Sequence, residues 1–214
     1  MKYKLISKSQ SSSEATLWFL GWGFDSSIEP LLPHEACDVI LIWDYTDLTF
    51  DLDLSQWQSF SVRAWSMGVW AAEMFILANP NLKISHTEAF CGTARPADIH
   101  SGIGSEAIQL TIDFWNEANR RKFARKIAID ANLASMVEPL LTSRTADDQK
   151  AELQSILNAQ AVKPDSSIIW DKAIVSRRDR IFPLASQLNW WEFHAREVEQ
   201  RDIPHWPFSQ KLDD

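Results

Sequence analysis

No part of the chain constrains its fold more than the eight residues from 63 to 70, RAWSMGVW. They follow an apolar segment with strand character and precede an apolar segment with helical character. This setting is typical of a nucleophile elbow, in which the pattern G-x-S-x-G holds a serine on a strained turn between a strand and a helix. Ala64 takes the place of the first glycine and is still small enough for that turn. We therefore predict a reactive Ser66 hydroxyl above a sheet edge, with the Met67 amide directed at the oxygen of a reacting carbonyl.

Apolar runs alternate with helical patterns, which predicts an α/β fold with a mostly parallel central sheet flanked by helices. We expect strands at residues 16–20, 39–43, 60–65, 84–90 and 168–175. We expect helices at residues 68–78, 105–116, 120–129, 146–159 and 184–191. Residues 94–164 carry helical patterns and no convincing strand, which predicts a helical lid insertion within a single domain of residues 1–214.

Composition and charge argue against several classes of function. The net charge of −8 argues against general nucleic-acid binding. No apolar stretch is long enough to span a bilayer, and the N-terminal residues do not resemble a secretion signal. Cys37 and Cys91 form neither a disulfide framework nor a metal motif. We therefore expect a cytoplasmic protein without membrane partner, cofactor or metal; the sequence leaves its oligomeric state open. Its eleven tryptophans predict a bulky aromatic core, with a few of them lining a pocket.

A serine nucleophile needs a base to take its proton and an acid to orient that base. In the order typical of such an elbow, the acid and then a histidine follow the serine. Asp179 lies in a loop just beyond the last expected strand; the alternative is a surface aspartate paired with a neighbouring arginine. His205 follows it in a proline-flanked loop, and prolines restrict the freedom of such a loop. His194 is the rival, at a helix end before another strand-like stretch. The other histidines precede Asp179 and fit this order badly: His34, His86 and His100.

The segment FLGWG at residues 19–23 follows the first expected strand. Glycines let a backbone approach a substrate closely, so we predict that the Trp22 amide is the second oxyanion donor beside Met67. A simple turn at the end of a strand would have the same sequence.

Residues 117–130 carry five basic and two acidic side chains, a local charge of +3 in an acidic chain. On a helical wheel, four of the bases share one side, opposite Phe123 and Ile127. The plain interpretation is a solvated helix face. The sharper one is a docking surface for an acidic partner. The four bases are Arg121, Lys122, Arg125 and Lys126.

Five segments taken together resemble the α/β-hydrolase superfamily. More closely, they resemble the pimeloyl-acyl-carrier-protein methyl ester esterases of biotin synthesis, of the compact BioG type. In matching order, the segments are FLGWG at 19–23, WDY at 43–45, AWSMGVW at 64–70, DRIFP at 179–183 and PHWPF at 204–208. Two positions depart from the superfamily pattern: Leu20, where a histidine usually precedes the oxyanion glycine, and Ala64.

The resemblance implies a serine esterase that hydrolyses the methyl ester of pimeloyl-acyl carrier protein and so ends pimelate synthesis. It implies that Ser66 is the nucleophile, His205 the base and Asp179 the group that orients it, with Trp22 and Met67 as oxyanion donors. Acyl carrier protein would be the acidic partner of the basic helix, although that assignment comes from charge alone. A general carboxylesterase or thioesterase with the same triad, and a non-catalytic carrier-protein binding module, remain alternatives.

Overall fold

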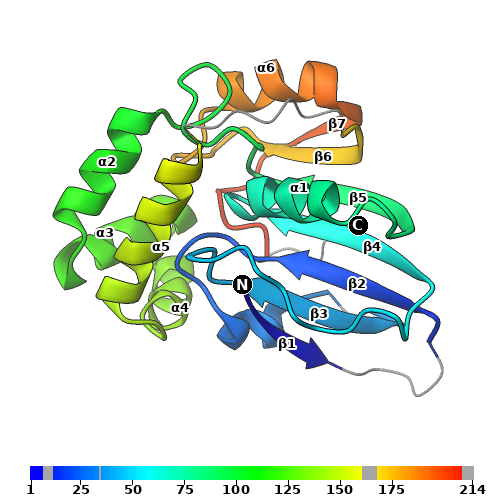
Figure 1. Ribbon diagram of the computed structural model, residues 1–214. Coiled ribbons are helices and arrows are strands. Elements are labelled where there is room, and N and C mark those ends of the chain that lie inside the picture. The colour runs from blue at the N-terminus through cyan, green and yellow to red at the C-terminus, as the bar shows by residue number, and fades with distance from the viewer. Residues whose placement is uncertain (7–11, 34, 161–167, 209–214) are drawn as a thin grey trace.

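The computed structural model describes residues 1–6, 12–33, 35–160 and 168–208. Within these residues, seven strands form one sheet in the order β1-β3-β2-β4-β5-β6-β7 (Figure 1). Each neighbouring pair is parallel except β1 with β3, so the expected mostly parallel sheet is confirmed. The strands are β1 (Lys2–Ile6), β2 (Glu14–Phe19), β3 (Asp38–Trp43), β4 (Ser59–Trp65), β5 (Ile84–Phe90), β6 (Trp170–Ser176) and β7 (Ala195–Arg201).

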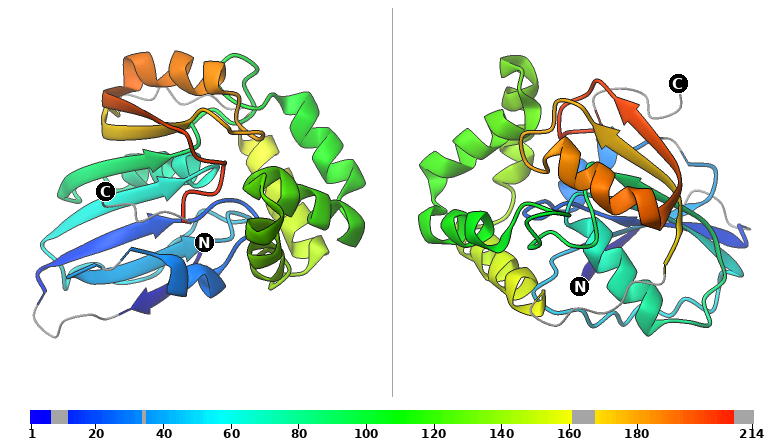
Figure 2. Two further views of the ribbon diagram at one scale, coloured as in Figure 1. Left: turned by 180° about the vertical axis from the view of Figure 1, so that it is seen from behind. Right: turned by 90° about the horizontal axis from the view of Figure 1, so that it is seen from above.

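Helices flank the sheet in two groups. Helices α1 (Gly68–Ala78) and α6 (Leu184–His194) pack against the same face (Figure 2). Between β5 and β6 the chain forms α2 (Ser105–Phe114), α3 (Glu117–Ala128), α4 (Ala131–Leu141) and α5 (Ala146–Ala159). These four helices gather beyond one end of the sheet (Figure 1). From residue 94 to residue 160 the structure contains no strand, and residues 161–164 of the expected insertion lie outside the described residues.

Three elements were not expected individually, and each has a weak sequence signal. Strand β1 is an antiparallel edge strand with mostly exposed residues, so it lacks the continuous apolar run that would predict a strand. The 3-10 helix η1 (Ser26–Leu31) has a single buried residue, Ile28. Helix α4 contains Pro139, which argues locally against a helix. Strand β7 corresponds to the strand-like stretch noted after His194.

Several boundaries differ by two or three residues from those expected, and capping explains one of the two three-residue shifts. Helix α3 begins at Glu117 because the side chain of Asn116 accepts a hydrogen bond from the amide of Asn119. It ends at Ala128, where Ile129 takes the left-handed conformation with φ 66°. The other three-residue shift is at the end of α6, which continues past the expected residue 191 to His194. The two-residue shifts are at the starts of β2 and β6 and at the end of α2.

Tryptophans form much of the core, as expected. Ten of the eleven are buried, and Trp43 is half-buried. The C-terminal segment 203–208 crosses the face of the sheet opposite α1 (Figure 2, left). There Trp206 packs against Trp65, Phe24 and Phe208 at ring distances of 5.0–5.4 Å. This aromatic cluster anchors the segment to the sheet.

Among the described residues, none of the helices combines the length and the apolar composition that a bilayer span requires.

Candidate active site

Ser66 lies on a sharp turn between β4 and α1. Its φ of 59° lies in the left-handed region, and its amide donates to the Phe90 carbonyl across 2.9 Å. A Cβ added to Gly68 would lie 2.4 Å from the Phe19 carbonyl oxygen, so only glycine fits at the start of the helix. The local sequence thus produces the strand–turn–helix arrangement that the pattern predicts.

Gly92 also shapes this turn, and the sequence analysis did not identify it. A Cβ added there would lie 2.2 Å from the carbonyl oxygen of Ser66 and 2.7 Å from its Cα. The backbone after β5 can therefore pass directly behind the serine only because residue 92 has no side chain. The signal was a glycine just after the neighbouring parallel strand, but nothing in the sequence states that β4 and β5 are neighbours.

The structure brings Ser66, His205 and Asp179 together from three separate segments. His205 Nε2 lies 3.0 Å from Ser66 Oγ, and His205 Nδ1 lies 2.8 Å from Asp179 Oδ2. The exposed fractions of Ser66 and His205 are 6% and 1%. In this arrangement the imidazole can accept the serine proton on one nitrogen while the carboxylate fixes the other.

The Asp179 carboxylate is held on both oxygens. Oδ1 accepts hydrogen bonds from the amides of Ile181 (2.7 Å) and Phe182 (2.8 Å). Oδ2 accepts one from the Gln187 amide group at 3.2 Å, in addition to His205. Its ion-pair partner among the described residues is His205 and not an arginine of its own loop. Gln187 was not anticipated, because a glutamine inside α6 carries no distinctive sequence signal.

Packing holds the imidazole of His205 in this position. The Trp65 indole N–H donates to the His205 carbonyl at 2.9 Å, and the Phe182 ring lies parallel to the imidazole. Packing of the Trp206 and Phe208 rings holds the segment that follows His205. The base therefore sits on a segment clamped by aromatic side chains.

The other histidines lie elsewhere. His194 stacks on Trp190 and bonds its carbonyl at 2.8 Å, at the end of α6. His86 lies 3.6 Å from Asp171 on β6, and His34 is outside the described residues. Burial, and to a lesser degree the charge of Asp179, raise the pKa of the Cys91 thiol well above its usual value. That thiol stays protonated and cannot compete with the serine as a nucleophile.

A narrow cavity of about 90 Å³ opens beside Ser66. Trp22, Met67 and His205 line it together with mostly apolar side chains. Among the described residues, neither the Trp22 nor the Met67 amide donates a hydrogen bond to another protein group. A Cβ added to Gly21 would lie 2.8 Å from the Trp65 ring, so glycine is required where this loop passes the elbow.

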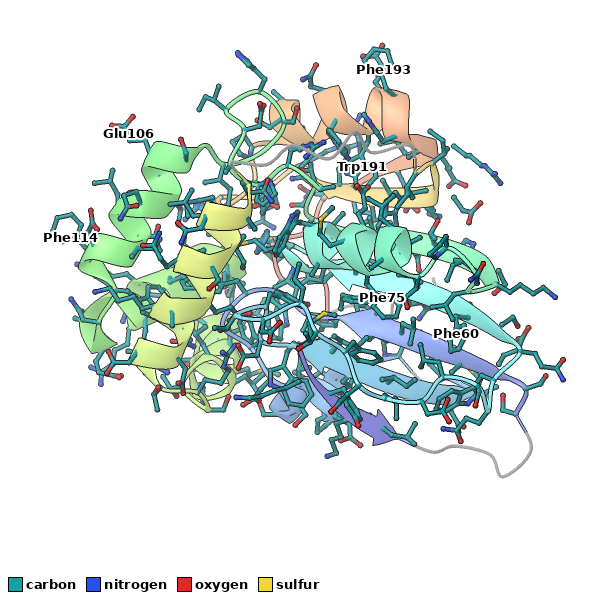
Figure 3. All side chains as sticks on the ribbon, viewed as in Figure 1. Phe60, Phe75, Glu106, Phe114, Trp191 and Phe193 are labelled. Atoms are coloured by element: carbon teal, nitrogen blue, oxygen red, sulfur yellow. The ribbon has the colours of Figure 1, made fainter. Side chains whose placement is uncertain are left out.

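The four predicted docking bases are exposed on α3. Arg121 pairs with Glu138 of α4 at 3.1 Å, and Lys126 also lines the cavity that contains Ser66. Arg120 is different: it is buried, and its guanidinium donates to the carbonyls of Leu141 and Arg144. The exposed charge is therefore smaller than the residue count in this stretch suggests. On helix α2, which precedes α3, Phe114 and Glu106 project outward (Figure 3).

Within the described residues, no three His, Cys, Asp or Glu side chains form a group that could hold a metal ion.

Comparison with known proteins gives a family and a fold. The chain matches the family described as pimeloyl-ACP methyl esterase BioG over residues 1–212. It is 32% identical over 196 residues to an uncharacterized protein of Haemophilus influenzae, covering 91% of this chain and 89% of that one. It is 34% identical over 196 residues to a malonyl-[acyl-carrier protein] O-methyltransferase of Bacteroides fragilis. That match covers 90% of this chain but 39% of the relative, so the chain spans well under half the length of that protein.

Solved structures show the same fold. The crystal structure of BioG from Haemophilus influenzae superposes with a TM-score of 0.87 at 31% identity, over 98% of this chain and 95% of that chain. An esterase from Exiguobacterium antarcticum superposes with a TM-score of 0.74 at 14% identity, over 97% and 89%. The second likeness concerns the fold alone. The expected α/β-hydrolase fold is confirmed.

Proposed function

Since the chain belongs to the pimeloyl-ACP methyl esterase BioG family, we propose that it is a serine esterase that hydrolyses the methyl ester of pimeloyl-acyl carrier protein in the cytoplasm. The observation that supports this most directly is the hydrogen-bonded series Ser66–His205–Asp179 at 3.0 Å and 2.8 Å. A serine with a buried, oriented imidazole is equipped for acyl transfer.

In the first half-reaction, Ser66 Oγ attacks the ester carbonyl while His205 Nε2 takes the hydroxyl proton. The carbonyl oxygen becomes negative and accepts hydrogen bonds from the Trp22 and Met67 amides. His205 then gives the proton to the departing methoxy oxygen, and methanol leaves an acyl-enzyme. Asp179 stabilises the imidazolium throughout, because its carboxylate stays bonded to Nδ1.

In the second half-reaction, a water molecule takes the place of methanol. His205 removes its proton, the hydroxide attacks the acyl-enzyme, and the proton returns to Ser66 Oγ. The product is the free carboxylate of the pimeloyl chain, still on its carrier protein. This reaction would end pimelate synthesis for biotin.

Carrier protein would dock on α3, where the bases Arg121, Lys122, Arg125 and Lys126 offer positive charge to an acidic partner. Lys126 supports this arrangement because it belongs both to the exposed face and to the cavity beside Ser66. We further propose that residues 94–164 are an insertion within the single domain 1–214 that controls access to the serine.

The test is to incubate the purified protein with pimeloyl-acyl carrier protein methyl ester and to follow the intact carrier by mass spectrometry. The expected product has lost one methylene mass and keeps its acyl chain. Ser66→Ala should abolish this change, whereas Ser135→Ala, which removes an exposed hydroxyl of α4, should leave it intact.

Release of the acyl chain from the carrier would instead indicate a thioesterase and contradict the proposed substrate bond. Methyl ester hydrolysis that survives Ser66→Ala would exclude Ser66 as the nucleophile. A wild-type protein that binds the carrier but leaves the ester intact would favour the non-catalytic carrier-protein binding module.

A further inference from the structure

We infer that Gln149 and Glu152, on helix α5, are positioning residues that hold the oxyanion loop, residues 21–23, in its working shape. The inserted helices are then one wall of the oxyanion site as well as a cover for it. This inference rests on the proposed serine chemistry and adds a role for two residues outside the triad.

Gln149 bonds the loop and its surroundings through side chain and backbone. Its amide group donates to the Gly23 carbonyl at 2.8 Å and to the Leu141 carbonyl at 2.6 Å. Its own carbonyl accepts from the Trp22 indole N–H at 2.7 Å. Its side-chain oxygen accepts from the Trp115 indole at 3.0 Å. A fully buried glutamine therefore fixes both the side chain of Trp22 and the carbonyl of Gly23.

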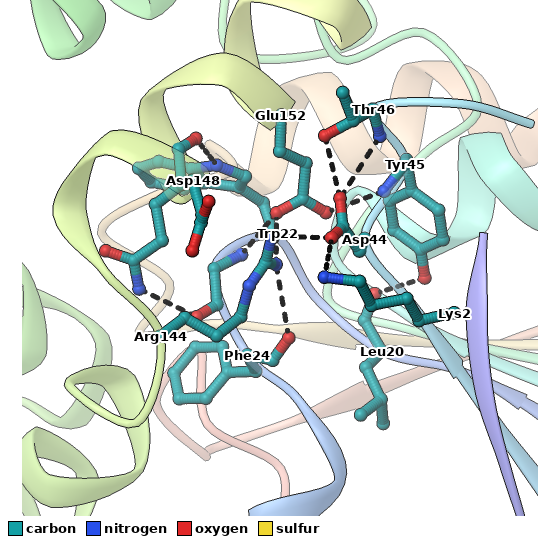
Figure 4. Close-up of polar contacts among 12 residues, drawn as sticks. Lys2, Leu20, Trp22, Phe24, Asp44, Tyr45, Thr46, Arg144, Asp148 and Glu152 are labelled. Carbon is teal, nitrogen blue, oxygen red and sulfur yellow. Dashed lines mark hydrogen bonds and ion pairs between the residues drawn. The ribbon is translucent and has the colours of Figure 1, made fainter.

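Glu152 lies one turn further along α5 and is also fully buried. Oε2 accepts from the Gly23 amide at 3.3 Å, and Oε1 accepts from the Tyr45 amide at 3.0 Å. Arg144 forms an ion pair with Glu152 and reaches Asp44 at 3.3 Å on its other side (Figure 4). Burial raises the pKa of Glu152, and the nearby Arg144 opposes that rise. One carboxylate thus joins the loop after β2, the loop after β3 and the inserted helices.

These contacts restrict how the insertion can move. Arg144 lies just before α5, so lifting α5 would take Glu152 away from the Gly23 and Tyr45 amides and would take Arg144 away from Asp44. Loss of such partners by buried charged groups is strongly destabilising. Gly23 has φ 84° and would otherwise be the freest point of the loop. Because α5 fixes its amide and its carbonyl, the neighbouring Trp22 amide keeps its direction. Preorganised donors of this kind stabilise the transition state and contribute little to ground-state binding.

The test is Glu152→Gln, assayed with a small p-nitrophenyl ester and with the carrier-bound methyl ester. The Gly23 amide, the Tyr45 amide and Arg144 all donate to this side chain, so a glutamine must turn its NH₂ toward one of these donors. We expect kcat on both substrates to fall roughly tenfold to a hundredfold with KM changed less than about threefold.

Asp44→Asn is the matched control. It removes the same charge from the other side of Arg144, and asparagine tolerates the left-handed φ of 60° at this position. Asp44 bonds Lys2 and Thr46 but not the oxyanion loop. If the network only stabilises the fold, both variants lower the melting temperature and both keep kcat. If Glu152 positions the loop, only its variant loses kcat.

Equal kcat values for Glu152→Gln and wild type, or equal losses in both variants, would overturn the inference. If Glu152→Gln does not fold, Gln149→Met is used in its place, and the same fall in kcat with little change in KM is expected. A wild-type protein that cleaves the small ester but not the carrier-bound one would refute the proposed substrate and leave this inference to be judged on the small ester. A wild-type protein inactive on both would refute the two together.

Discussion

Replacing Gly92 by alanine should misplace the nucleophile without removing any atom of the triad. The new Cβ would start 2.2 Å from the Ser66 carbonyl oxygen, whereas ordinary contacts of a Cβ begin at 3.4 Å. The backbone of Ser66, which lies two residues before α1 and whose amide bonds the Phe90 carbonyl, must therefore move by about 1 Å. A misplacement of about 1 Å at a reacting group lowers the rate roughly a hundredfold, or about 2.7 kcal/mol of activation free energy.

Hydrolysis of a p-nitrophenyl ester gives kcat, and thermal unfolding reports how much stability the same substitution removes. We expect a loss of about 1–3 kcal/mol of stability, which is typical of an overpacked site. Gly102→Ala is the control, because its Cβ would start 2.1 Å from the Arg95 carbonyl oxygen, a similar clash with a backbone outside the elbow. It should lose comparable stability and keep kcat within about threefold.

A Gly92→Ala protein that folds and retains kcat within about threefold of wild type would refute the reasoning. That result would mean that the chain after β5 yields to the methyl group and that the elbow does not depend on it. Equal kcat losses in the two glycine variants would also refute it, because the effect would then be general.

Three further predictions concern docking, packing and acid stability. Reversing Arg121 and Arg125 to glutamate should lower kcat/KM on carrier-bound ester about tenfold or more and leave kcat/KM on the small ester unchanged. The control is the same charge reversal at Lys83 and Arg196, which lie at the amino ends of strands. Equal losses of kcat/KM on both esters would exclude docking at α3. Trp206→Ala should lower the free energy of unfolding by about 3–5 kcal/mol and should also reduce kcat through His205. Trp57 is also buried, so Trp57→Ala is the control: in the same denaturant titration and assay it should affect stability alone. Hydrogen bonding from Arg201, with a smaller one from Lys172, lowers the pKa of Glu199 from its usual 4.5 to about 2. Because this pKa is below the unfolded value, the ion pair stabilises the fold above pH 4.5 and is lost as the pH falls toward 2; urea titrations of Glu199→Gln should show a shallower acid loss than wild type, and identical curves would contradict the assignment.

The elbow could be predicted because its demands are local. Small residues at 64 and 68, a serine between them and apolar segments on both sides suffice to identify the turn. The chain order of acid and histidine then selected Asp179 and His205 among several alternatives, and the structure brings both to the serine. Their catalytic roles remain predictions until the variants are measured.

Other parts of the site could not be found this way. Gly92 matters because β5 lies beside β4, and Gln187 matters because α6 folds back over the loop of Asp179. Neither residue type is unusual at its place in the sequence. Helix α4 was obscured by Pro139, and β1 by its lack of a buried face.

Three features could be predicted from neighbouring residues: the strand–turn–helix at Ser66, the alternating α/β pattern and the basic helix. Backbone strain, hydrophobic periodicity and local charge all depend on residues that are close together in the chain. Three other features became visible only in the folded protein: the glycine that lies behind the serine, the aromatic packing around His205, and the contacts of Gln149 and Glu152 on α5 with the loop of Trp22. Those contacts join residues up to 140 positions apart, and the spacing of residues along a chain does not specify such distances. They follow from sheet order and helix packing, which arise when the whole core is buried at once.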